Sequence, residues 1–73
     1  MNYPKELFFP IENTDHLIAR ITLNIDRGSY YAEVDLLLNE SRKIFHHVGE
    51  FYGFSDEDEC LKTALDKTSL YFK

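Results

Sequence analysis

Hydrophobic and polar residues alternate along the segment from His16 to Asp26. Apolar side chains fill every second position: Leu17, Ala19, Ile21, Leu23 and Ile25. A period of two is that of a strand with one buried face. The next residues, Asp26-Arg27-Gly28-Ser29, include a glycine that tolerates a positive φ. The pattern therefore predicts a strand that ends in a tight hairpin turn.

A second alternating segment runs from Tyr30 to Asn39, and a polar turn, 39–42, follows it. One side of the segment carries Tyr30, Ala32, Val34, Leu36 and Leu38, and the other carries Tyr31, Glu33, Asp35, Leu37 and Asn39. A third strand is expected from Lys43 to Phe54, but its alternation is imperfect. A bulge at Gly49 would bring the two halves into one register, and Gly53 indicates a second irregularity.

The last segment, 55–73, has helical spacing. Ser55 is a good N-cap residue, and Asp58 follows it three positions later as in a capping box. Acidic residues fill the first turn, where the helix dipole favours negative charge. One apolar stripe follows at helical spacing: Cys60, Leu61, Ala64, Leu65, Thr68, Tyr71 and Phe72. The sequence therefore predicts an amphipathic helix that covers one face of the sheet.

The beginning of the chain, 1–15, is expected to be an extended arm or a short edge strand. Pro4 and Pro10 bracket the apolar residues 7–9, and a proline has no N–H to give to a sheet. The whole chain is then a single α+β domain. It consists of a three- to four-stranded antiparallel meander over 16–54 with one C-terminal helix on one face.

The length, the charge and the cysteine content of the chain exclude several classes of protein. The chain has 73 residues, a formal net charge of −5 and a single cysteine. It is too short for more than one domain and cannot form an internal disulfide. Its acidic balance disfavours contact with nucleic-acid phosphates. We find neither a run of about 20 apolar residues, as a membrane span needs, nor an export signal, so we expect a cytoplasmic protein without a membrane partner.

Candidate chemistry is sparse. His46 and His47 invite a metal site, but adjacent strand residues point to opposite faces and cannot easily share one ion. Cys60 falls on the apolar stripe of the helix, which predicts a buried structural thiol. Glu33 and Asp35 share one strand face and form a possible carboxylate pair, although solvated strand faces are far commoner. We expect no enzyme, no catalytic residues, no cofactor and no metal, because no catalytic or phosphate-binding motif is present.

One helix covers only one face of the sheet, so the other face is left open. The expected contact residues on that face are Ile18, Tyr31, Leu37 and Phe45. Large aliphatic and aromatic side chains dominate contact energies, and so small a core gains from association. The sequence therefore favours a small non-enzymatic interaction module that forms a homodimer through the open sheet face. Contact through a sheet edge or the arm, and a monomer whose arm folds over the open face, remain alternatives.

An acidic inhibitor or nucleic-acid mimic is the other function that the sequence allows. Its acidic patch would consist of Glu50, Asp56, Glu57, Asp58 and Glu59. Such a patch could bind a basic groove on an unknown protein partner. A small enzyme ranks third, and direct binding of RNA to the aromatic face ranks below the protein-binding alternatives.

Overall fold

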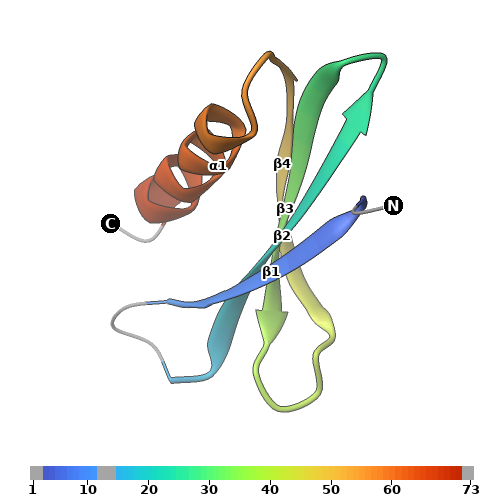
Figure 1. Cartoon of the computed structure of the whole chain (residues 1–73). Coiled ribbons are helices and arrows are strands. Elements are labelled where there is room, and N and C mark those ends of the chain that lie inside the picture. The colour runs from blue at the N-terminus through green and yellow to red at the C-terminus, as the bar shows by residue number, and fades with distance from the viewer. Residues whose placement is uncertain (1–2, 12–14, 72–73) are drawn as a thin grey trace.

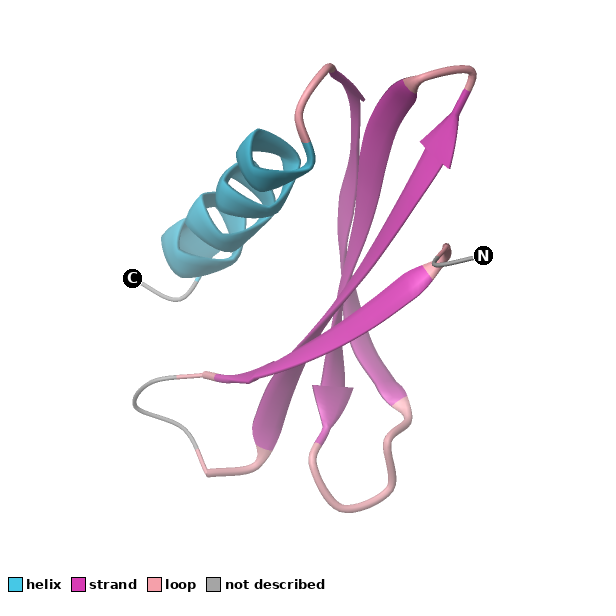
Figure 2. Cartoon of the chain, viewed as in Figure 1, coloured by secondary structure: helices cyan, strands magenta, loops and turns pink. Residues whose placement is uncertain are grey.

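The computed structural model describes residues 3–11 and 15–71, and it has four strands followed by one helix. The elements are β1 (Lys5–Pro10), β2 (Leu17–Asp26), β3 (Ser29–Leu38), β4 (Ile44–Phe54) and α1 (Glu57–Tyr71). The strands form one antiparallel sheet in the order β1-β2-β3-β4, and the helix lies on one side of it (Figures 1 and 2). The predicted α+β meander is confirmed, and the segment before residue 16 contains an edge strand.

The β2–β3 hairpin closes at the predicted turn. Asp26 pairs with Ser29, and the two residues between them, Arg27 and Gly28, have φ angles of 53° and 79°. Positive φ at both central positions is the geometry of a turn whose twist matches that of the flanking strands. The turn fixes the register of the whole hairpin, so that Arg20 lies opposite Asp35.

β4 is irregular near Gly49 and Gly53, as the sequence indicated, and also at Phe45, which the sequence did not indicate. Val34 pairs with Gly49 but Asp35 pairs with His47, so Val48 is an extra residue next to Gly49. A second register shift leaves Phe45 without a partner residue on β3, and a third shift lies near Gly53, whose φ is 87°. The three shifts turn the apolar and polar side chains of β4 to their faces of the sheet, although the sequence of this strand does not alternate regularly. They also interrupt the regular hydrogen bonding between β3 and β4.

The core lies between the helix and the sheet. Its larger buried cluster comes from β2, β3 and α1: Ile21, Leu23, Ala32, Val34, Cys60 and Ala64. A second cluster consists of Ile11, Leu17, Ala19 and Leu36. The buried positions of the helix, with Thr68, follow the predicted apolar stripe as far as the side chains are described. Leu7 and Phe9 pack against the core from β1, so the beginning of the chain is not an arm folded over the opposite face.

The helix begins at Glu57, one residue later than an N-cap at Ser55 predicts. The Cys60 N–H donates a hydrogen bond to the Asp56 carbonyl at 3.1 Å, which places Asp56 rather than Ser55 at the N-cap. In the first turn Glu57 accepts a hydrogen bond from the Lys5 ammonium at 3.1 Å. This ion pair connects the edge strand to the start of the helix. The described residues include no helix that is both long enough and apolar enough to cross a membrane.

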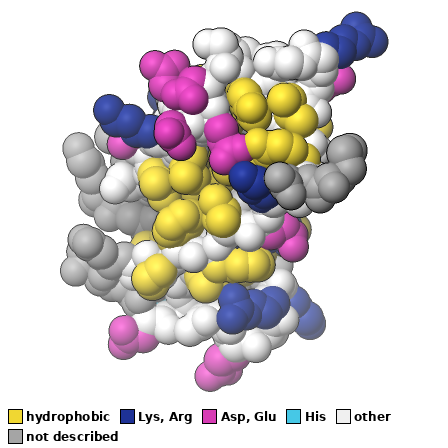
Figure 3. All heavy atoms as spheres, in the orientation of Figure 1, with side chains coloured by type: hydrophobic (Ala, Val, Ile, Leu, Met, Phe, Trp, Pro, Cys, Tyr) yellow, Lys and Arg dark blue, Asp and Glu magenta, His cyan; other side chains and the backbone are white. Residues whose placement is uncertain are grey.

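Several large apolar side chains remain exposed outside the core, mostly on the edge strands. The helix packs mainly on β3 and β4. With β1 in front, hydrophobic side chains gather across the middle of the molecule (Figure 3). Five large apolar side chains are between 37% and 62% exposed: Phe8, Ile25, Ile44, Phe45 and Tyr52. Four of these five lie on the edge strands β1 and β4.

Candidate interaction face

The sheet face opposite the helix, here called the open face, is organised in rows that cross the strands. The strand registers place side chains from neighbouring strands next to one another, and each row has its own chemistry. The order along the strands from the β2–β3 turn is an aromatic pair, an acidic row, a central charged row and an apolar row.

The central charged row joins Phe8, Arg20, Asp35 and His47 across all four strands. Asp35 is only 2% exposed although it faces away from the helix. Its carboxylate accepts a hydrogen bond from Arg20 Nη2 at 2.9 Å, and its other oxygen lies 2.7 Å from His47 Nδ1. A buried carboxylate is stable in this place because both oxygens have partners.

This network shifts the acidity of two groups. Burial alone would raise the pKa of Asp35, but hydrogen bonds from His47 and Arg20 and their positive charges together hold it below its ordinary value. The hydrogen bond to Asp35 raises the pKa of His47, and the charges of Asp35, Glu33 and Glu50 add to this effect. The hydrogen bonds of this row are therefore strongest when Asp35 is ionised and His47 is protonated.

The acidic row joins Glu6, Thr22, Glu33 and Glu50. Glu33 and Glu50 lie directly opposite each other, and like charges in that position are unfavourable. The Tyr52 hydroxyl donates a hydrogen bond to Glu50, which raises the pKa of the phenol. This part of the face is a region of negative potential open to solvent.

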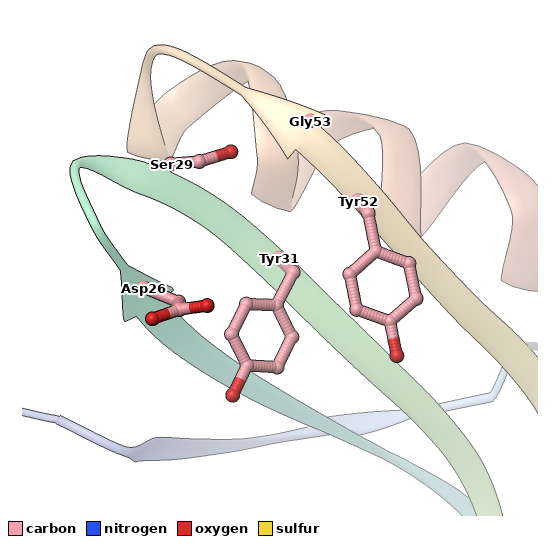
Figure 4. Close-up of a pocket in the computed structure, with 5 residues that line it drawn as sticks. All are labelled: Asp26, Ser29, Tyr31, Tyr52 and Gly53. Atoms are coloured by element: carbon pink, nitrogen blue, oxygen red, sulfur yellow. The ribbon is translucent and has the colours of Figure 1, made fainter.

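The aromatic pair consists of Tyr31 and Tyr52, whose rings stack with centroids 5.2 Å apart. The two rings lie side by side on β3 and β4, close to the end of the sheet that carries Asp26, Ser29 and Gly53 (Figure 4). These five residues line a shallow depression of about 260 Å³. Tyr31 is half-buried by this stacking, whereas Tyr52 is exposed.

The apolar row joins Pro10, Ile18, Leu37 and Ile44 at the opposite end. The guanidinium of Arg42, from the β3–β4 turn, lies over the ring of Phe8 at 5.5 Å from its centroid. A second shallow depression, of about 340 Å³, is lined here by Glu6, Phe8, Ile18, Arg20, Leu37 and Arg42. This end of the face therefore combines apolar surface with a positive charge.

The expected contact residues occupy different environments. Ile18 and Tyr31 are half-buried on the open face, and Phe45 is exposed at a bulge of β4. Leu37 lies on the open face but is only 2% exposed, so it offers almost no area for contact. Sequence reasoning missed Phe8, Ile44 and Tyr52. The alternation of β1 between its two prolines could have indicated Phe8, but the bulges of β4 hid the other two.

The residues of the expected acidic patch do not share one surface. Glu50 lies on the open face opposite Glu33, whereas the helix packs on the other side of the sheet. Within the helix, Glu57 is paired with Lys5. Asp56, Asp58 and Glu59 remain exposed near the helix start.

The remaining candidate groups are placed as their patterns indicated. Cys60 is fully buried, and burial, with a contribution from Glu57, raises the pKa of its thiol. His46 pairs with Leu36 and His47 with Asp35, so the two histidines belong to opposite faces. The register places His47 next to Glu33 and Asp35, and the donor atoms of these three residues lie within 4.8 Å of one another. These are the described residues that could hold a metal ion.

The fold and the face define a class of small α+β domain, a four-stranded antiparallel meander with one helix and one open face. Comparisons with protein-family models, with curated proteins and with solved structures gave no match.

Proposed function

We propose that the chain is a small non-enzymatic interaction module that forms a homodimer through its open face. The observation that carries the proposal is the pattern of exposure on this face. Phe8, Ile44 and Tyr52 present large apolar or aromatic side chains there, and solvent-exposed clusters of this kind are typical of contact sites. A core formed by one helix and one sheet is small, so association would add stability that the single domain lacks.

Pairing through the sheet edges is less favourable than pairing through the face. β1 has six residues and ends in Pro10, which lacks an N–H donor. β4 carries register shifts that disturb its hydrogen-bonding pattern along most of its length. Short strands, prolines and bulges are features that keep edge strands from adding further strands. The face is the surface that remains for a specific contact.

Charge complementarity favours a second copy as the partner. The exposed acids Glu6 and Glu50 lie in one row, and the guanidinium of Arg42 lies over Phe8 in the next row, the central charged row. A two-fold axis that lies in the plane of the interface, perpendicular to the strands, would place Glu6 of one copy against the Arg42 guanidinium of the other. The central charged row of each copy would then lie near the centre of the interface. Packed sheets are about 10 Å apart, a distance that arginine side chains can bridge.

Sedimentation of a double variant tests the open face. Phe8→Ser together with Ile44→Ser removes two exposed anchors, and we expect the dimer dissociation constant to rise about 100-fold. The matched control is Ile25→Ser, because Ile25 is also exposed but belongs to the helix-facing side of β2. Ile25→Ser should sediment like the wild type, at twice the chain mass of 8.6 kDa. A wild-type chain that stays monomeric at about 100 μM, or a control that dissociates equally, would refute the proposal.

A further inference from the structure

We propose that Glu33, Asp35 and His47 form a binding site for a divalent transition-metal ion of the zinc type. This site goes beyond the proposed dimer, because all three ligands come from one chain. Imidazole and carboxylate together are a donor set that suits Zn²⁺.

The strands bring the three donors together without any loop. Glu33 and Asp35 are two residues apart on β3 and therefore share a face, and His47 lies opposite Asp35 on β4. Their donor atoms lie within 4.8 Å of one another, and the closest two, Asp35 Oδ1 and His47 Nδ1, are 2.7 Å apart. Zinc bonds of about 2.0–2.2 Å need donors about 3.4 Å apart in a tetrahedron. Small side-chain rotations reach this separation.

Arg20 orients one ligand by a hydrogen bond, and Glu50 lies close to another. Arg20 Nη2 donates a hydrogen bond to one carboxylate oxygen of Asp35 at 2.9 Å, and the other oxygen faces His47 Nδ1 at 2.7 Å, where an ion would replace the shared proton. His47 Nε2 lies 3.8 Å from a carboxylate oxygen of Glu50, so the ring nitrogen that does not bind metal faces an acceptor. Metal-binding histidines and carboxylates are characteristically oriented by outer partners of these kinds.

The local charge also favours a cation. Glu33 faces Glu50 directly across the strands, and His47 offsets the repulsion of this pair only while its imidazole is protonated. Arg20 is engaged with Asp35 and lies 3.9 Å from Glu6. A divalent ion beside Glu33 would relieve this repulsion. In the single chain the side chain of His47 is 46% exposed, so an ion can reach the site from solvent before the open faces of two copies associate.

The neighbouring histidines provide a matched pair of variants. His46→Gln changes the adjacent histidine on the opposite face, and His47→Gln removes a proposed ligand. Calorimetric titration of the metal-free chain with ZnCl₂ should give one ion bound per chain, with a dissociation constant below about 100 μM. We expect His47→Gln to weaken binding at least 100-fold and Glu33→Gln to weaken it at least tenfold. His46→Gln should bind as the wild type does.

Three outcomes would overturn the site. The first is the absence of binding heat up to about 1 mM ZnCl₂. The second is an equal loss of zinc affinity in His46→Gln and His47→Gln. The third is zinc binding that persists in both His47→Gln and Glu33→Gln. Circular dichroism of each variant establishes that it is folded, and His47 and Glu33 are sufficiently exposed for their replacement to leave the core intact. The Phe8→Ser/Ile44→Ser chain should bind zinc normally, so failure of the dimer and failure of the metal site give different results.

Discussion

Replacement of Ile21 by alanine is expected to remove most of the stability of the domain. Ile21 is fully buried at the centre of the sheet, between Leu7 and Val34 on the neighbouring strands. The residue opposite Val34 on β4 is Gly49, and the space above it is already filled by the ring of Phe51. A buried Ile→Ala replacement costs about 3–4 kcal/mol through lost burial and the cavity that remains. A domain of this size typically has only about 5 kcal/mol in total.

Urea unfolding followed by circular dichroism measures this loss, at one protein concentration for every variant. The matched control is Ile25→Ala, because Ile25 lies on the same strand and the same side but is 37% exposed. We expect the control to lose at most about 1 kcal/mol. Equal losses at the two positions would contradict the assignment of Ile21 to the centre of the core.

Asp35→Ala is the second large expected effect. The variant leaves Arg20 without its 2.9 Å partner and His47 without its acceptor, in the most enclosed part of the open face. Breaking a buried ion pair from one side costs about 3 kcal/mol. The matched control is Glu33→Ala, two residues away on the same face, where removal of a half-exposed acid opposite Glu50 should change stability by at most about 0.5 kcal/mol. Both variants are measured by urea unfolding with a chelator present.

The effect of Asp35→Ala should depend on pH with a definite sign. The pKa of Asp35 is lowered in the folded chain, so its contribution is complete above the ordinary value of 3.8 and is lost as the pH falls through the folded pKa. The stability difference between wild type and variant should therefore be large at pH 5 and shrink below pH 3.8. A difference that grows in acid would contradict the paired, charged state of Asp35.

The sequence predicted the β2–β3 hairpin and the two faces of its strands, because the alternation of residues and the turn between the strands determine both. The alternation from Leu17 to Ile25 and the turn at Gly28 together determine which residues of β2 and β3 are opposite each other. The juxtaposition of Arg20 and Asp35 follows from that register alone. The start of the chain was ambiguous between an arm and a strand, because its two prolines fit both.

The fourth strand could not be placed in register from the sequence. Gly49 indicated a bulge, but the extra residue is Val48, and the register depends on how Phe51 and Val48 both reach the core. Only this register sets His47 beside Asp35 and produces the central charged row. The burial of Leu37 was equally hidden, because its surroundings on the open face include Ile18 of another strand and Arg42 of a turn.

Mixing two charge-reversed chains tests the central claim of self-association through the open face. One chain carries Arg42→Glu, and the other carries Glu6→Lys and Glu50→Lys. In a two-fold dimer each variant opposes like charges when it pairs with itself, whereas one copy of each restores both contacts. Sedimentation should therefore find each variant monomeric alone and the equimolar mixture dimeric. Two variants that dimerise alone, or a mixture that stays monomeric, would contradict the proposed interface.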